Sequence, residues 1–149
     1  MSTVQFEVAS DGGPVLEPGT YILEADNIED AEPGQYGPQL RWSFKVSDAV
    51  TPDEPIRGAD AEPYRFFQWT GTRPTPRSRC RQLIEALYGR PLINGERPRA
   101  DLMIGRRMKV LIVHVDDANG KPRARISGEV PPKPFPRHGE DVVEPVPES

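Results

Sequence analysis

Polar and apolar residues alternate without a break over residues 39–46, Gln-Leu-Arg-Trp-Ser-Phe-Lys-Val. A period of two predicts a β-strand with one apolar face and one polar face. The apolar face can build a core, and we expect Trp42 to lie in it. The polar face carries two cations, Arg41 and Lys45, and no carboxylate of its own. It is therefore either a solvated basic face or part of a site for a polyanion.

The same kind of pattern predicts four further strands. They are expected over residues 20–29, 64–70, 108–115 and 123–128. The Asn119-Gly120 pair between the last two is a strong signal for a hairpin turn. Irregular connections are expected over residues 30–37, 47–63 and 91–105, where proline, glycine and acidic residues gather.

One amphipathic helix is expected between Thr75 and Gly89. Thr75 suits the N-cap, Pro76 the first helical position, and Gly89 the residue just past the end. The apolar stripe at i, i+3, i+4 and i+7 consists of Cys80, Leu83, Ile84 and Leu87. This spacing predicts a helix that packs on the sheet, and it favours Cys80 as a small buried apolar residue rather than a nucleophile.

Strand 64–70 carries aromatic residues on both faces. The faces consist of Tyr64, Phe66 and Gln68, and of Arg65, Phe67 and Trp69. We favour the second set as outward, because burying Arg65 without a partner would cost far more than burying Gln68 with one. The opposite phase, which would place Phe67 and Trp69 in the core, is left open.

The composition favours one all-β domain. The chain has 149 residues, 36% hydrophobic content, 18 prolines and 13 glycines, which is typical of a β-rich body with irregular loops and ends. We expect a loose N-terminal leader over residues 1–17, a folded domain over residues 18–130 and a disordered, proline-rich acidic tail over residues 131–149.

The net charge of −4 hides an uneven distribution. Residues 1–35 contain eight acidic and no basic residues, residues 36–130 contain 17 basic and 11 acidic ones, and residues 131–149 contain two and four. A basic middle can bind a polyanion although the whole chain is acidic.

No motif for catalysis, cofactor binding or metal binding occurs in the sequence. The single cysteine excludes an internal disulfide, and His114 and His138 do not form a cluster with metal-ligand spacing. Nucleophile elbows and Walker loops are missing. Neither a signal peptide nor a membrane-spanning stretch is recognised. We expect a cytoplasmic protein that is not an enzyme and has no cofactor, metal site or membrane partner.

Three strands, a helix and a two-stranded hairpin follow the element order of the OB-fold, a five-stranded Greek-key barrel with a helix between strands three and four. In that barrel the outer faces of strands two and three, with the loops joining strands one to two and four to five, bind oligonucleotides. The candidate nucleic-acid-binding residues are Tyr36, Arg41, Lys45, Arg65, Phe67, Trp69, Arg73, Arg77, Lys121, Arg123 and Arg125.

The chain also resembles a group of small phage-encoded single-stranded-DNA-binding proteins over about residues 18–130. The matching segments are Pro18-Gly19-Thr20-Tyr21, residues 36–44, Ala86-Leu87-Tyr88-Gly89 and residues 101–107. The resemblance implies an OB-fold that binds single strands during phage DNA replication, recombination or repair in the host cytoplasm, with replication or recombination proteins as partners. The acidic tail is similar to the partner-recruiting tails of such proteins, but it ends Pro147-Glu148-Ser149, without the terminal phenylalanine of the bacterial versions.

Two hypotheses of different class follow from the sequence. The first is a sequence-tolerant single-stranded-DNA-binding protein that acts by base stacking and phosphate contacts. The second is an OB-fold adaptor that binds another protein and has no affinity for nucleic acid, since a fold alone does not decide a function. Assembly of several copies and the choice between DNA and RNA are left open.

Overall fold

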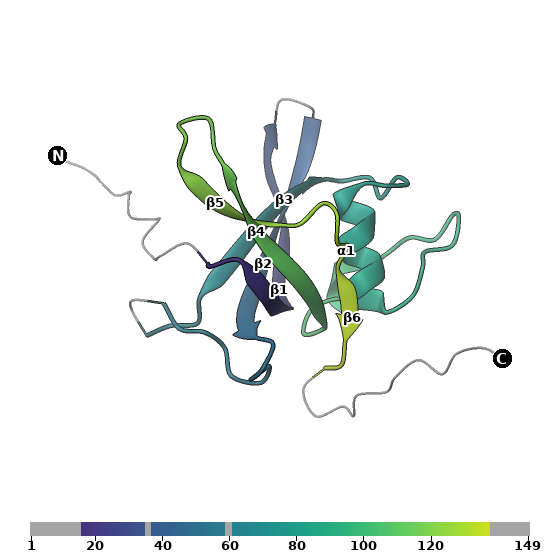
Figure 1. The fold of residues 1–149 in the computed structure, drawn as a ribbon. Coiled ribbons are helices and arrows are strands. Elements are labelled where there is room, and N and C mark those ends of the chain that lie inside the picture. The colour runs from purple at the N-terminus through teal and green to yellow at the C-terminus, as the bar shows by residue number, and fades with distance from the viewer. Residues whose placement is uncertain (1–15, 35–36, 59–60, 138–149) are drawn as a thin grey trace.

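The computed structural model describes residues 16–34, 37–58 and 61–137. These residues form one open antiparallel sheet of six strands, with a single α-helix beside it (Figure 1). The strands are β1 Gly19–Gly34, β2 Gly37–Asp48, β3 Arg65–Gly71, β4 Arg107–Asp116, β5 Pro122–Ile126 and β6 Lys133–Phe135. The helix α1 spans Arg79–Tyr88 and the short 3-10 helix η2 spans Ala100–Leu102. The expected mostly-β architecture and the helix between the third and fourth strands are confirmed.

The strand order of the sheet is β3-β2-β1-β4-β5, and β6 pairs with β4. Strand β1 lies at the centre, where it pairs with β2 along most of its length and with β4 only through residues 19–24. This order leaves β3 and β5 as the two ends of the path, which is the arrangement on which the candidate site depends.

The core lies between the inner face of the sheet and α1. Leu23 and Ala25 of β1 stand opposite Val46 and Phe44 of β2, and each of these four side chains is at most 1% exposed. The predicted stripe of α1 supplies the other side of the core, since all of its members are buried: Cys80, Leu83, Ile84 and Leu87. The alternation of the strands and the spacing of the helix therefore meet in one apolar layer.

The start of the helix corrects the sequence prediction. The N-cap is Ser78, not Thr75, because the Ser78 hydroxyl accepts a hydrogen bond from the Arg81 backbone N–H at 3.1 Å. Arg77 just before it has a φ of 70°, which is incompatible with a right-handed helix. The predicted end is confirmed, since Gly89 adopts the left-handed conformation with a φ of 78°.

The connection expected over residues 30–37 is also corrected. Strand β1 continues through Asp30 and Ala31, which pair with Leu40 and Gln39, so these residues extend a two-stranded arm. The register shifts between Ala31 and Gly34, a segment that contains a proline without a backbone donor. Proline and glycine here disturb the ladder locally instead of ending it.

The prediction of a disordered tail from residue 131 is wrong for residues 131–137. Strand β6 pairs with β4 and contacts α1. Its anchor is Arg107, whose side chain is only 4% exposed. The Arg107 Nε donates to the Pro136 carbonyl at 2.7 Å, its guanidinium lies 5.0 Å from the centre of the Phe135 ring, and its Nη1 donates to Asp53 Oδ1 at 2.7 Å. Residues 138–149 of the predicted tail lie outside the described residues.

In the described ranges, no helix combines the length and the apolar character needed to cross a membrane.

Candidate nucleic-acid interface

Two aromatic side chains of β3 lie on the outer face of the sheet. Phe67 is 41% exposed and Trp69 is 48% exposed. Phe66 of the same strand points into the core and is only 6% exposed. The two exposed rings have centroids 6.2 Å apart and are tilted by 44°. The favoured phase of this strand is confirmed.

Strand β2 fixes that phase from the inside. Trp42 is 1% exposed, as predicted for a core residue, and its indole Nε1 donates to the Thr70 hydroxyl of β3 at 2.8 Å. This buried hydrogen bond and the pairing of Ser43 with Phe67 hold β3 in one register. A slip of one residue would bury Arg65 and expose the core side chains, so the outward position of Phe67 and Trp69 is strongly determined.

The cations of β2 and β3 stand beside these rings, but carboxylates of β1 neutralise them. Arg41 pairs with Glu29 and also lies over the Phe67 ring, 5.1 Å from its centre. Lys45 and Arg65 both reach Asp26, at 3.9 Å and 3.3 Å. The polar face of β2, which has no carboxylate of its own, receives its carboxylates from the neighbouring strand.

Sequence reasoning missed Asp26 and Glu29 as members of this face. The acidic residues of β1 were visible, but their register against β2 was not. In the structure Glu29 stands opposite Arg41, and the register shift between Ala25 and Asn27 brings Asp26 to the same side. An antiparallel pairing of the two strands would have suggested cross-strand ion pairs of this kind.

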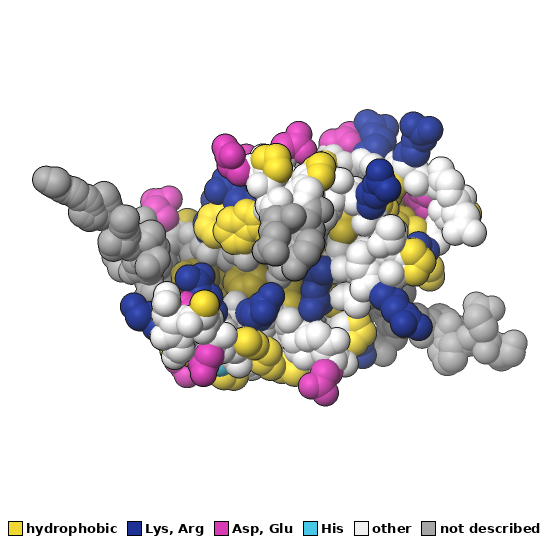
Figure 2. Space-filling view, turned by 90° about the horizontal axis from the view of Figure 1, so that it is seen from above, with side chains coloured by type: hydrophobic (Ala, Val, Ile, Leu, Met, Phe, Trp, Pro, Cys, Tyr) yellow, Lys and Arg dark blue, Asp and Glu magenta, His cyan; other side chains and the backbone are white. Residues whose placement is uncertain are grey.

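A groove of about 310 Å³ separates β3 from the β4–β5 hairpin. One wall contains Phe67 and Trp69, and the other contains Arg123 and Arg125, with Asp116 and Asp117 near the turn. The two ends of the sheet thus line one depression. Figure 2, which looks down on the hairpin ends, shows Lys and Arg side chains interspersed with hydrophobic ones instead of one unbroken basic patch.

Asp117 holds the hairpin that forms the second wall. Its Oδ1 accepts hydrogen bonds from the backbone N–H groups of Asn119 and Lys121, at 2.8 and 3.0 Å, and its Oδ2 accepts one from Arg123 Nε at 3.1 Å. These bonds lower the pKa of the Asp117 carboxyl, with the Lys121 backbone N–H as the largest cause. The predicted turn is confirmed, with Gly120 at a φ of 78°.

Arg125 and Lys121 differ from Arg123, the third cation of the hairpin, which pairs with Asp117. Both are exposed, and no ion pair of either is found among the described residues. Arg125 instead lies near a second cation, Arg79, whose Nη2 donates to the Ile126 and Ser127 carbonyls at 3.3 Å. Burial lowers the pKa of the Arg79 guanidinium, and the charge of Arg125 lowers it further. Positive charge is therefore concentrated at the end of β5.

The remaining candidates do not join the groove. Arg73 and Arg77 are exposed in the segment between β3 and α1 and do not line it. Tyr36 lies outside the described residues. Eight of the eleven candidates are thus placed on the β2–β3 face or the hairpin, four of them on the groove itself: Phe67, Trp69, Arg123 and Arg125.

The cysteine, the histidine and the acidic side chains of the described residues are of the types that ligate metal ions. No group of three His, Cys, Asp or Glu side chains in these ranges could hold a metal ion. Cys80 is 2% exposed, and burial raises the pKa of its thiol. The ring Nε2 of His114 lies 2.6 Å from the Leu16 carbonyl, a bond that ties the start of the described chain to β4.

The structure is thus a mostly-β protein with a groove between an aromatic wall and a wall that carries two arginines and two aspartates. When the sequence is compared with protein-family models and with curated proteins, nothing matches. The function is therefore inferred from the residues themselves.

Proposed function

We propose that this protein binds single-stranded DNA without strong sequence preference, by base stacking on β3 and phosphate contacts along the groove. The observation that carries the proposal is the pairing of walls: Phe67 and Trp69 on one side, Arg123 and Arg125 on the other. Stacking platforms beside a positively charged groove are the common design of sequence-tolerant single-strand binding.

The proposal includes an OB-fold. Closing the β3-β2-β1-β4-β5 sheet would bring together its end strands, β3 and β5, and these already line one groove. The helix α1 lies between β3 and β4, the position at which the OB-fold also has a helix. The strand β2 and β3 faces and the β4–β5 turn are the usual oligonucleotide surface of the fold.

The aromatic rings supply most of the binding energy in this proposal. Stacking one base on an aromatic side chain is worth about 1–3 kcal/mol by alanine substitution, whatever the base. Trp69 offers the larger open ring, since the Arg41 guanidinium already lies over Phe67. The phosphates then follow Arg123 and Arg125 across the groove.

The biological setting of the proposal comes from the resemblance to phage-encoded proteins. Single strands are intermediates of replication, recombination and repair, so we place the protein in one of these processes in the host cytoplasm. The proteins of the same processes are its proposed partners.

Tryptophan fluorescence with oligo-dT tests the proposal directly. The chain has two tryptophans, of which Trp42 is buried and Trp69 is half exposed. In the unaltered chain we expect DNA to quench the exposed Trp69, and a Trp69→Phe variant, which keeps the buried Trp42–Thr70 hydrogen bond, should lose this quenching. If about four phosphates are neutralised, the salt slope is about −3, so raising salt from about 50 to about 200 mM weakens binding roughly fiftyfold.

One observation favours the alternative of an adaptor without nucleic-acid affinity. Arg41, Lys45 and Arg65 already have carboxylate partners on β1, as in a surface that is merely solvated. The same titration separates the two functions, because the adaptor gives neither quenching nor salt dependence with oligo-dT.

A further inference from the structure

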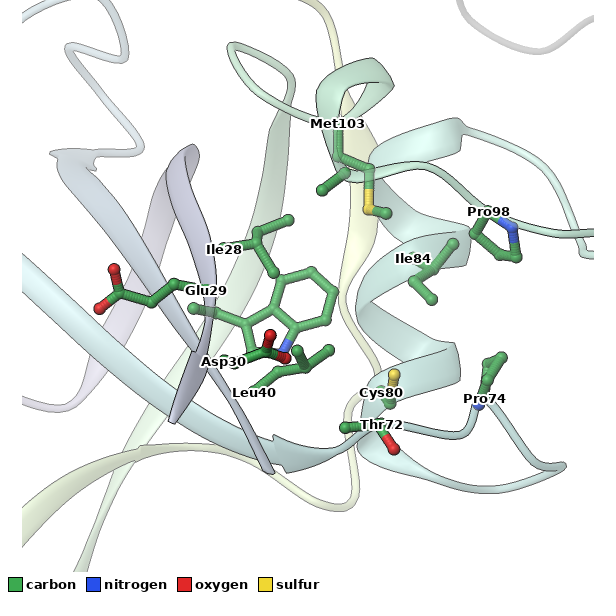
Figure 3. Close-up of a pocket in the computed structure, with 12 residues that line it drawn as sticks. Ile28, Glu29, Asp30, Leu40, Thr72, Pro74, Cys80, Ile84, Pro98 and Met103 are labelled. Carbon is green, nitrogen blue, oxygen red and sulfur yellow. The ribbon is translucent and has the colours of Figure 1, made fainter. Parts of the chain in front are cut away.

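A second cavity lies on the other side of the β1–β2 arm, between this arm and α1. It measures about 470 Å³, which is within the range of ligand pockets. Its walls come from five parts of the chain: β1, β2, the segment between β3 and α1, α1 itself, and the segment around η2. Ile28, Ile84 and Met103 point into it from three of these elements (Figure 3).

The floor of this cleft is apolar and its mouth is acidic. Trp42, Ile84 and Met103 are each at most 4% exposed, so a ligand would meet their apolar surfaces at the bottom. The charged residues of the lining are Glu29 and Asp30, with no lysine or arginine. Glu29 points away from the cleft toward its partner Arg41. Asp30 is exposed, and no ion pair of Asp30 is found among the described residues.

We infer that this cleft, the arm–helix cleft, receives an apolar side chain from a segment of another protein in which that side chain is flanked by lysine or arginine. Its volume admits one large side chain, and the Asp30 carboxylate can pair with a neighbouring cation at the mouth. The inference does not depend on the proposed DNA binding.

Charge complementarity argues against two other occupants. A DNA strand would bring phosphates to a mouth where Asp30 is the charged group that faces the cleft (Figure 3). The chain's own ends are also acidic: residues 1–15 carry Glu7 and Asp11 with no lysine or arginine, and residues 138–149 carry four acidic residues and none of these cations. A basic and apolar partner segment fits the cleft best.

Three capped tripeptides probe the inference: acetyl-Lys-Phe-Lys-amide, acetyl-Glu-Phe-Glu-amide and acetyl-Lys-Gly-Lys-amide. Methyl NMR of the full chain follows Ile28, Ile84 and Met103 during each titration. We expect the first peptide to shift these methyl groups in a saturable way. The Glu peptide should bind several-fold more weakly, and the Gly peptide should leave the methyl groups unmoved.

Two variants locate the site. Asp30→Asn should lower the binding affinity of the Lys-Phe-Lys peptide about two- to fivefold, as expected for the loss of a solvent-exposed ion pair. Ala100→Phe should abolish binding, because Ala100 is an exposed member of the lining and a larger side chain there fills the mouth. Trp69→Ala is the matched control, since Trp69 lies outside this cleft and should leave peptide binding unchanged.

The inference is overturned if the Lys-Phe-Lys peptide moves none of the three methyl groups, or if the Glu peptide binds as tightly as the Lys peptide. An unchanged affinity in Asp30→Asn overturns the role of the carboxylate even if Ala100→Phe fails to fold. If the protein does not bind oligo-dT, the proposed function fails, but the peptide test still stands because the cleft and the groove are lined by different residues.

Discussion

The two cationic regions beside the aromatic pair differ in how their charge is compensated. On the β2–β3 face, Arg41, Lys45 and Arg65 each have a carboxylate of β1 within ion-pair distance. On the β4–β5 hairpin, Arg123 pairs with Asp117 at 3.1 Å, whereas Arg125 and Lys121 have no carboxylate partner among the described residues, and Arg125 lies near Arg79.

This difference matters for any anionic ligand. A phosphate that approaches Arg125 relieves repulsion between two like charges, whereas one that approaches Arg41 must displace Glu29. Exposed ion pairs are worth only about 0–1 kcal/mol, so displacement is feasible but not free. If the protein binds DNA as proposed, we expect Arg125 on the hairpin to be the stronger phosphate contact and the β2–β3 face to contribute mainly through its rings.

The largest expected effect falls on Trp69, which lies between the two regions. If both regions hold one strand of DNA, Trp69→Ala should lower the affinity for oligo-dT about 5- to 150-fold, which corresponds to about 1–3 kcal/mol of lost stacking. Anisotropy of a labelled oligonucleotide measures the change. Trp69→Phe is the matched control and should keep most of the affinity. A folded Trp69→Ala protein that binds as the parent does would refute stacking at this ring.

The comparison between the regions is tested next by removing charge from each. Arg125→Gln should lower affinity about fivefold and reduce the magnitude of the salt slope by about 0.7, the contribution of one phosphate on a single strand. The double variant Arg41→Gln with Glu29→Gln removes a neutral pair and keeps the net charge, so its salt slope should equal that of the parent. Equal slope changes in both proteins would show that the regions are equivalent.

The sequence carried the local features of the fold and missed those set by distant segments. Alternation placed Trp42 inside, and the cost of burying Arg65 favoured Trp69 outside while the opposite phase stayed open; the structure confirms the favoured phase. Strand β6 was missed, because prolines predict disorder locally. Its order comes from Arg107, which is distant in sequence and holds residues 135 and 136.

In the candidate site, too, local features were predictable from the sequence and those set by distant segments were not. The side chains of the groove were predictable one strand at a time, from Phe67 on β3 to Arg125 on β5. The neutralising role of Asp26 was not, because it depends on the register of β1 against β2 and on the shift after Ala25. Charge counted along one strand says nothing of the charge that a neighbouring strand brings.

A smaller effect, of opposite sign, is expected from Asp26, which reaches two cations of the β2–β3 face. Asp26→Asn frees Lys45 and Arg65 for phosphate, so affinity for oligo-dT should rise about two- to fivefold and the salt slope should become steeper. Asp30→Asn makes the same charge change on the same strand, where no ion pair is found among the described residues, and should have a smaller effect. A gain in both variants of equal size would point to net charge alone.

The smallest expected effect is that of Asp117 on the free energy of unfolding at acidic pH. Its folded-state pKa is lowered, first by the Lys121 backbone N–H and then by Arg123, below the ordinary value of 3.8. A lowered carboxyl pKa in the folded protein contributes stability that is fully present above the unfolded-state pKa and is lost as the pH falls through the folded-state pKa. Asp117→Asn should therefore lower the free energy of unfolding at pH 6, and the gap to the parent should close below pH 3.8. Urea denaturation across this range measures the gap. A gap that stays constant would mean that the ionised carboxylate does not anchor the hairpin. Other contacts would then have to hold the hairpin that carries Arg125 beside the groove.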